Sequence, residues 1–365
     1  MKSPMKTTIR FLLSALLITA TFNNCLADEP TLKNRYEPMF KIGTAASAFQ
    51  LHGTTADLVK SQFNSLTPEN CMKPDALYRG DGNCDFRQAD ALVDFAQANG
   101  LAVRGHTLVW HSQTPKTFFL DDQNNRLDKT VLYARLEQYM TAVLTHFRGK
   151  VYCWDVVNEA LADGGPGIYR VHSPWYEICG PEFIAEAFRM ARRIDPEIKL
   201  FYNDYNLIDP AKRGRAVAML KELKATGVPI DGVGLQGHWN AGSFNPQELQ
   251  NSLDAFAELG LEIQITELDI SVYTPYHGPD NEKRNQSMAQ KPYTEDVANQ
   301  LADAYEKAFA VLRRNADKIS GVTFWGISDR FTWLNYFPHR GRKDYPLLFD
   351  DNGQPKKAFH RVVDF

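Results

Sequence analysis

Two glutamates near the ends of apolar segments are the residues in this sequence best suited to chemistry. Glu159 ends the segment 151–159, and Glu267 lies close to the end of the segment 262–270. Both segments are short and contain several β-branched or aromatic residues, which predicts buried strands rather than helices. Two carboxyl groups at strand ends indicate an enzyme that uses paired carboxylates. For either glutamate alone, the simpler interpretation is that it begins a polar loop.

Each glutamate is expected to share one face of its strand with particular neighbours, because side chains alternate along a strand. These faces are Cys153, Asp155, Val157 and Glu159 in the first segment, and Ile263, Ile265, Glu267 and Asp269 in the second. The alternation therefore predicts a second carboxylate, Asp269, on the side of Glu267.

The other predicted strands also end in polar and aromatic residues. These are Glu69 with Asn70, His106 with Trp110, Asn158, Asn203 with Asp204 and Tyr205, Gln236 with His238 and Trp239, and Trp325. Sugar hydroxyls need paired donors and acceptors, and the C–H faces of a sugar stack on aromatic rings. Any single tryptophan at such a position can instead be a packing residue. Their coincidence at most strand ends favours a carbohydrate site.

A metal site is the alternative use of the histidines. His106, His111 and His238 could be proposed as a triad of ligands. No H-E-x-x-H or similarly close spacing supports this interpretation. We therefore expect no metal, and no organic cofactor is implied because side chains can supply both proton transfer and nucleophilic attack.

The elements that must position these residues alternate along the chain between strands and helices. Strands are predicted at 40–46, 65–70, 102–110, 151–159, 199–205, 231–239, 262–270 and 321–328, and helices at 86–99, 129–147, 181–194, 210–226, 246–259 and 294–319. This order predicts a single (β/α)8 barrel over residues 28–365. A doubly wound sheet is the alternative, but neither glycine-rich phosphate motif that such sheets use is present.

Residues 1–27 have the pattern of an export signal. A basic start is followed by the apolar run 11–22 and by Cys25-Leu26-Ala27, a small-x-small cleavage site. The mature protein is expected to be secreted or periplasmic, without a membrane segment, and monomeric. A lipid anchor on Cys25 is the alternative, and the residues before Cys25 fit it poorly.

Charge and cysteine content restrict the partners and the redox chemistry. The leader removes three of the 41 basic residues and none of the 44 acidic ones, so the mature chain has a net charge of −6. This balance opposes nucleic-acid binding and suits a neutral substrate. Cys71 and Cys84 are close enough in sequence for one disulfide in an oxidising compartment. Cys153 lies within a strand and is expected to be an inert buried thiol.

Several motifs in order along the chain resemble one enzyme family. They are 67–73 (TPENCMK), 104–111 (RGHTLVWH), 154–160 (WDVVNEA), 234–238 (GLQGH), 265–269 (ITELD), 325–329 (WGISD) and Trp333. Together they resemble glycoside hydrolase family 10, whose members are mostly endo-β-1,4-xylanases on a (β/α)8 barrel. The resemblance covers the chain from about residue 40 to its end. The departure is Cys71 with Cys84 around the loop after the second strand.

The resemblance implies a retaining mechanism with Glu159 as the acid/base and Glu267 as the nucleophile. Such a mechanism requires carboxyl groups about 5–5.5 Å apart. The negative charge of Glu267 is expected to raise the pKa of Glu159 and to keep it protonated. His238 is expected to donate a hydrogen bond to Glu267 while Asp269 orients the ring.

The resemblance also implies the substrate contacts. Asn158 matches the residue that contacts the sugar 2-hydroxyl, and Tyr205 is a candidate for the aglycone side. The glycone-binding positions are Glu69, Asn70, Lys73, His106, Trp110, Gln236, Trp325 and Trp333. The substrate would be xylan and xylo-oligosaccharides. A glycosidase acting on cellulose or mannan, and a catalytically inactive sugar-binding barrel, are the rival hypotheses.

Overall fold

Eight parallel strands form a closed barrel in the computed structural model, which describes Met1 and residues 30–80, 82–274 and 289–365. The barrel strands are β1 (Lys41–Ala46), β2 (Ser65–Pro68), β3 (Ala102–Trp110), β4 (Cys153–Asn158), β5 (Lys199–Asp204), β6 (Gly232–Leu235), β8 (Glu262–Ser271) and β9 (Ile319–Phe324). Neighbouring barrel strands pair in chain order, and β9 pairs with β1. β6 pairs directly with the first half of β8, and the short β7 (His238–Asn240) pairs with the end of β8. The predicted (β/α)8 barrel is confirmed.

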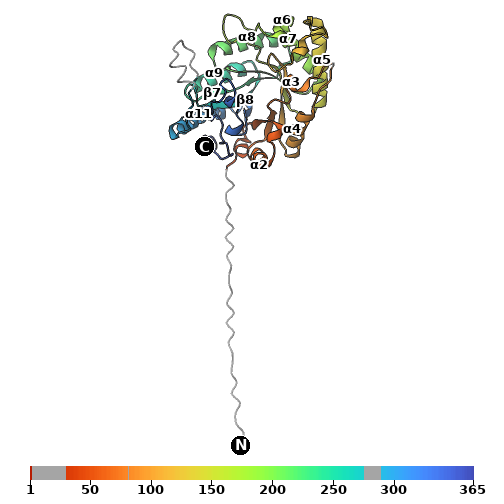
Figure 1. Ribbon diagram of the computed structural model, residues 1–365. Coiled ribbons are helices and arrows are strands. Elements are labelled where there is room, and N and C mark those ends of the chain that lie inside the picture. Colours follow the sequence, from red (N-terminus) through yellow and green to blue (C-terminus); the bar gives the residue numbers. More distant parts are fainter. Residues whose placement is uncertain (2–29, 81, 275–288) are drawn as a thin grey trace.

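Helices surround the strands, as Figure 1 shows. They are α1 (Leu32–Tyr36), α2 (Gly53–Gln62), α3 (Pro74–Leu77), α4 (Arg87–Ala98), α5 (Lys129–His146), α6 (Pro174–Cys179), α7 (Glu182–Ile194), α8 (Pro210–Ala225), α9 (Pro246–Ala257), α11 (Glu295–Arg314) and α12 (Lys357–Val363). The six helices predicted from the sequence are present, each shorter by one to five residues at an end. The short helices α1, α2, α3, α6 and α12 were not predicted.

The helices begin where the sequence provides caps. Asp209 accepts hydrogen bonds from the N–H groups of Ala211 and Lys212 at the start of α8. Asn245 does the same for Gln247 at the start of α9, and a proline follows each cap. A side-chain acceptor at the cap and a proline with a preset φ both favour helix initiation.

A continuous apolar layer lies between the helices and the barrel. The helices contribute completely buried side chains to it, among them Leu92, Leu136, Ile184, Leu220, Leu253 and Leu312. On the strand side, the indole of Trp154 packs against Gly105, where an added Cβ would come within 2.3 Å of the ring. Glycine at position 105 therefore permits β3 and β4 to pair closely around this indole.

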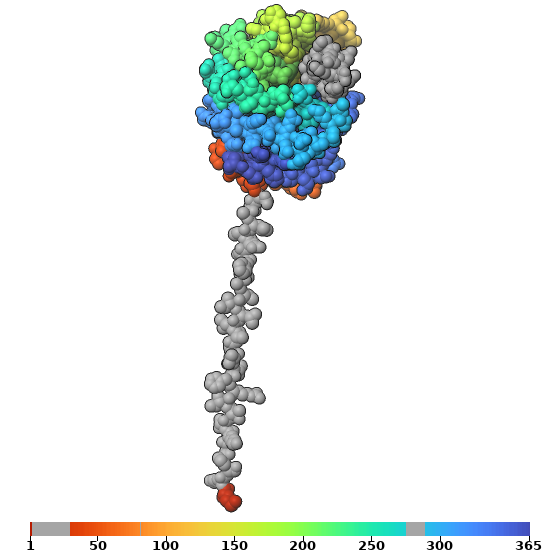
Figure 2. All heavy atoms as spheres, turned by 90° about the vertical axis from the view of Figure 1, so that its left-hand side faces the viewer, coloured from red at the N-terminus to blue at the C-terminus, as the bar shows by residue number. Residues whose placement is uncertain are grey.

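The two ends of the barrel domain lie against each other. The N-terminal orange segment and the dark blue C-terminal segment are adjacent at the bottom of Figure 2. The Tyr36 hydroxyl of α1 donates to the carbonyl of Val362 in α12 at 2.6 Å. Arg35 and Arg313 lie over the ring of Phe365, at 4.3 and 4.1 Å from its centre. These contacts join the first and last helices of the barrel.

Two predictions about the strands are wrong. The predicted strand 231–239 is broken after Leu235, because Gly237 has a φ of +85° that an extended strand does not permit. The alternation predicted for 151–159 does not continue to its end, because the pairing of β4 with both neighbours shifts register beside Val156. Glu159 then leaves the strand with a φ of +58°.

The predicted disulfide is also absent from the part of the chain that the structure describes. Cys71 and Cys84 are both free thiols there. Cys71 packs in the core, whereas Cys84 forms a backbone bridge with Tyr78 beyond α3. Burial raises the pKa of the Cys71 thiol to about 12 and that of the Cys84 thiol to about 11, so both are protonated and unreactive. Cys153 is a buried free thiol, as predicted.

Candidate active site

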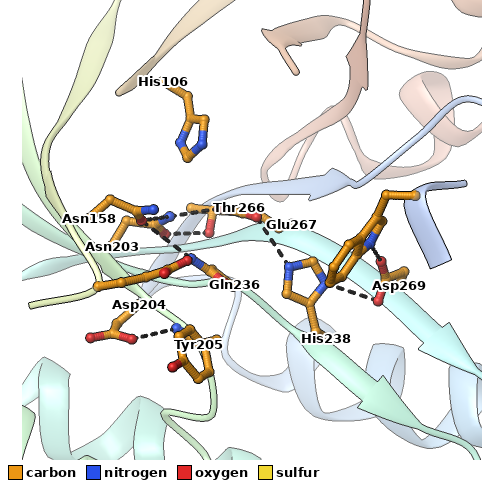
Figure 3. A network of polar contacts seen from close by, with 12 residues as sticks. His106, Asn158, Asn203, Asp204, Tyr205, Gln236, His238, Thr266, Glu267 and Asp269 are labelled. Carbon is orange, nitrogen blue, oxygen red and sulfur yellow. Dashed lines mark hydrogen bonds and ion pairs between the residues drawn. The ribbon is translucent and has the colours of Figure 1, made fainter. Parts of the chain in front are cut away.

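The polar residues predicted at the strand ends meet at the carboxyl-terminal mouth of the barrel. Figure 3 shows Glu267 near His238 on one side and Asn203 and Thr266 on the other. Both hydrogen-bonding atoms of the Glu267 carboxylate are used within this network. The site therefore lies where barrel folds carry their functional groups, although it is assembled from strands far apart in sequence.

Glu267 is buried, with 5% of its surface exposed. Its Oε1 accepts a hydrogen bond from Asn203 Nδ2 at 2.8 Å, and its Oε2 lies 3.2 Å from His238 Nε2. Burial alone would raise the pKa of Glu267. The His238 hydrogen bond and the charges of His106 and His238 outweigh it, so the pKa is below its usual value. Glu267 is therefore ionised at neutral pH.

His238 connects Glu267 to a second carboxylate, as predicted. Its Nδ1 lies 3.0 Å from Asp269 Oδ1, and the indole nitrogen of Trp333 donates to Asp269 Oδ2 at 2.8 Å. Burial disfavours the charged imidazole, but Asp269 and Glu267 outweigh this effect and raise the pKa of His238 to about 10. His238 is thus a cation that donates to both carboxylates.

Glu159 follows the last residue of β4 and is half-buried. Its carboxylate accepts a hydrogen bond from Trp110 Nε1 at 2.8 Å and from Gln236 Nε2 at 3.0 Å. Burial, followed by the negative charge of Asp204, raises the pKa of Glu159 to about 7. Glu267 raises the pKa of Glu159 too, as expected, but contributes less than burial and Asp204.

Three amides bridge the two glutamates. Asn203 Nδ2, besides bonding Glu267, lies 2.9 Å from Asn158 Oδ1, and Gln236 Nε2 lies 3.3 Å from the same oxygen. Asn203 is oriented by the Thr266 hydroxyl, which donates to its Oδ1 at 2.6 Å. The sequence indicates Asn203 only as a strand-end residue, and its position two residues before the predicted Tyr205 is the signal that could have identified it.

Three of the predicted glycone-binding residues, Asn70, Trp110 and Trp325, lie around Lys73, which is 5% exposed. Its Nζ donates to Asn70 Oδ1 at 2.9 Å and lies 5.0 and 5.9 Å from the ring centres of Trp110 and Trp325. Burial lowers the pKa of Lys73, although Glu267, Glu69 and Glu159 oppose this effect.

Neighbouring residues complete this cluster. Glu69 accepts from the Ser47 hydroxyl at 3.4 Å, and burial raises its pKa despite the nearby Lys73. Gln113, which the sequence reasoning missed, accepts from Lys73 Nζ at 2.8 Å. Its loop position, with no chemical motif around it, provided no signal.

His106 belongs to a buried network inside the barrel. Its Nδ1 lies 2.9 Å from Asp155 Oδ2, and Arg104 forms an ion pair with the same carboxylate. The His106 ring meets Trp325 edge-on, with ring centres 5.3 Å apart. Arg104 and Asp155 were not predicted as site residues. They orient His106 from the interior of the barrel.

Tyr205, predicted on the aglycone side, lies beside the loop that follows Glu159. Its hydroxyl accepts a hydrogen bond from Arg170 Nη2 at 2.6 Å, and Lys212 Nζ lies 3.2 Å from its ring centre. The proposed histidine triad does not assemble. Within the described ranges, no group of three or more His, Cys, Asp or Glu side chains could hold a metal ion.

A closed barrel with an ionised carboxylate, a second carboxyl group of raised pKa and surrounding amides and indoles defines a glycoside-cleaving enzyme. The family model of glycosyl hydrolase family 10 matches residues 31–365, and the chain belongs to this family.

Relatives and solved structures agree with this membership. A Dictyoglomus thermophilum protein named Beta-1,4-xylanase is 46% identical over 361 residues, covering 97% of this chain and 98% of the relative. Endo-1,4-beta-xylanase A of Caldicellulosiruptor saccharolyticus is 42% identical and covers 92% of this chain and 96% of the relative. The crystal structure of xylanase B from Clostridium stercorarium F9 superposes with a TM-score of 0.85 at 40% identity, covering 92% and 100% of the two chains.

Proposed function

We propose that this chain is a retaining endo-1,4-β-xylanase, with Glu267 as the nucleophile and Glu159 as the acid/base. The observation that carries the proposal is the opposite tuning of two carboxyl groups in one hydrogen-bonded network. The pKa of Glu267 is lowered, while that of Glu159 is raised to about 7. A retaining glycosidase needs one carboxylate that is ionised and one carboxylic acid that is protonated. The names of the relatives support xylan as the substrate.

In the first step, the Glu267 carboxylate attacks the anomeric carbon and the glycosidic C–O bond breaks. The proton of Glu159 passes to the glycosidic oxygen, and the other part of the xylan chain leaves with this oxygen as a free hydroxyl group. In the second step, Glu159 removes a proton from water, and the water oxygen attacks the anomeric carbon. The ester bond to Glu267 then breaks, which restores both carboxyl groups to their starting states.

The cause of the raised pKa bears on how Glu159 changes roles. When Glu267 becomes an ester its charge is lost, but this charge raises the pKa of Glu159 less than burial and Asp204 do. Burial and Asp204 act in both steps. The pKa near 7 itself lets one group donate a proton and accept one at neutral pH, since the best catalytic pKa is close to the working pH.

The surrounding residues support binding of xylose units. Asn158, which lies between Asn203 and Gln236, would contact the 2-hydroxyl of the sugar on Glu267. Lys73, Asn70 and Glu69 would bind the hydroxyls of the neighbouring sugar. Trp325 and Trp333, near His238, would close the space that the C5 hydroxymethyl group of glucose requires. A rigid site that excludes this group would prefer xylan over glucan.

We also propose that the enzyme acts outside the cytoplasm as a monomer, after removal of residues 1–27. Residues 2–27 of this leader lie outside the described residues. Among the residues that the structure describes, no helix has the length and apolar character needed to cross a membrane.

One experiment tests activity, substrate and stereochemistry together. The purified protein is incubated with xylan, mixed-linkage glucan and mannan, and the products are followed by chromatography and by NMR of the first-formed anomer. Short xylo-oligosaccharides with a β-configured new end are expected. Absence of any released sugar would favour the inactive sugar-binding alternative, and an α-configured product would exclude retention.

A further inference from the structure

The backbone at Glu159 has a conformation that its neighbours impose. Its φ of +58° lies in the left-handed region that side chains other than glycine rarely adopt. The N–H of Glu159 donates to the carbonyl of Asn203 at 2.9 Å, and the next N–H, that of Ala160, donates to the Tyr202 hydroxyl at 3.1 Å. The carbonyl of Glu159 accepts a hydrogen bond from Arg170 Nε at 3.1 Å. Such a conformation persists only where the surroundings determine it.

Arg170 reaches this carbonyl because the loop after β4 folds back on itself. Leu161 and Tyr169 form an antiparallel bridge, and the N–H of Ala162 donates to the carbonyl of Ile168 at 2.9 Å. The N–H of Arg170 then donates to the carbonyl of Ala160 at 2.8 Å. The hairpin therefore returns the chain to Glu159 after eleven residues.

The guanidinium of Arg170 is also held by two side chains. Its Nη2 donates to the Tyr205 hydroxyl at 2.6 Å and to Asp163 Oδ2 at 3.0 Å. The other oxygen of Asp163 lies 2.9 Å from Lys212 Nζ. Lys212 is 3% exposed and forms a second ion pair, also at 2.9 Å, with the buried Asp204. The ammonium and the two carboxylates thus anchor the arginine from the side of α8.

We infer that Arg170 is a positioning residue for Glu159, holding the peptide unit from which the carboxyl group reaches the glycosidic oxygen. This inference rests on the proposed role of Glu159 as the acid/base. Arginine suits the task because Nε and Nη2 lie on one edge of a rigid planar group and can bond two partners at once. Lysine would keep the charge but would lose this two-point contact.

The test uses aryl β-xylobiosides whose leaving groups range from dinitrophenol, which needs no proton, to phenol, which does. For Arg170→Met, kcat/KM should fall less than about 3-fold with dinitrophenol. With phenol it should fall about 10- to 100-fold, which is part of the roughly 10²–10⁴ that an acid/base contributes. Arg170→Lys should behave similarly. General damage to the fold would instead lower kcat/KM equally for every leaving group, and circular dichroism melting checks the folding of each variant.

Arg215→Met is the matched control. Arg215 holds the same hairpin at its far end, donating to the carbonyls of Gly167 at 3.0 Å and Gly165 at 2.6 Å, but it does not contact Glu159. Its variant should leave the dependence on the leaving group unchanged. An effect of Arg215→Met equal to that of Arg170→Met would mean that the loop as a whole, and not Arg170, is responsible.

A double variant separates this inference from the assignment of Glu159. With the phenyl substrate, Arg170→Met should cause no further loss in a Glu159→Ala background, since its effect passes through that side chain. A full additional loss, or an equal loss for all leaving groups in the single variant, would overturn the role of Arg170. If Glu159→Ala itself shows no dependence on the leaving group, the acid/base assignment is what fails.

Discussion

Replacing Trp110 with phenylalanine is expected to move the alkaline limit of activity to higher pH. The indole N–H of Trp110 donates to Glu159 Oε2 at 2.8 Å, and this bond favours the ionised carboxylate. Phenylalanine keeps an aromatic ring beside Lys73 but has no donor. Without this hydrogen bond the ionised form of Glu159 is less stable, so Glu159 should keep its proton to a higher pH.

The size of the expected pKa shift follows from the free energy of this hydrogen bond. A hydrogen bond to a charged group contributes roughly 1.5–3 kcal/mol. Glu159 is half-buried, so water recovers part of this energy, and the lower end of the range, about 1.5 kcal/mol, is appropriate. Because 1.36 kcal/mol corresponds to about one pKa unit, the pKa of Glu159 should rise from about 7 to roughly 8.

The assay is the pH dependence of kcat/KM for phenyl β-xylobioside, whose alkaline limb reports the acid in the free enzyme. Trp325→Phe is the control, because Trp325 meets His106 edge-on and does not serve as the donor to Glu159. Its alkaline limb should stay in place even if KM changes. An alkaline limb that is unmoved or shifted to lower pH in Trp110→Phe would refute this account of Glu159.

Four further outcomes are expected. Glu267→Ala should abolish turnover, whereas azide should rescue Glu159→Ala on a dinitrophenyl glycoside and yield a β-glycosyl azide; no azide product would count against the assigned roles. Truncating Trp325 or Trp333 should narrow the ratio of aryl-xylobioside to aryl-cellobioside hydrolysis, and an unchanged ratio would dismiss steric exclusion by these rings. The fold raises the pKa of His238 from 6.5 to about 10. The resulting contribution to folding stability is fully present below pH 6.5 and is lost as the pH rises through 10. The melting-temperature gap between wild type and His238→Gln should therefore narrow over that window, and a widening gap would contradict the sign. The intact mass of the exported protein should correspond to a chain that begins at Asp28. After unfolding and alkylation, the mass should show four modified thiols. A lipid-sized mass increment on Cys25 would instead mean a membrane anchor.

Much of the architecture could be predicted from the sequence because it depends on local patterns. Strand and helix periods, with caps such as Asp209-Pro210, indicated the eight repeating units of the barrel. In a barrel all parallel strands point the same way, so residues at their carboxyl ends must converge. For this reason Glu159, Glu267, His238 and Asp269 could be placed together before any distance was known. The motifs around these residues indicated membership of glycoside hydrolase family 10.

Only the tertiary structure decided the features that depend on closure of the barrel. The register shift in β4 and the left-handed backbone at Glu159 arise from pairing with strands on both sides, and no local pattern encodes them. The free thiols of Cys71 and Cys84 likewise reflect where the fold places the two side chains, not their sequence spacing.

The protonation states in the site were also decided only by the tertiary structure. The sequence suggested that Glu267 would raise the pKa of Glu159, whereas burial and Asp204 contribute more. Desolvation depends on every atom packed around a carboxyl group, and charge interactions depend on distances across the barrel. The sequence by itself therefore determined that Glu159, Glu267, His238 and Asp269 meet at the mouth of the barrel. The folded arrangement decided their protonation states and brought Arg170 to the carbonyl of Glu159, because burial and long-range distances exist only once the chain has closed.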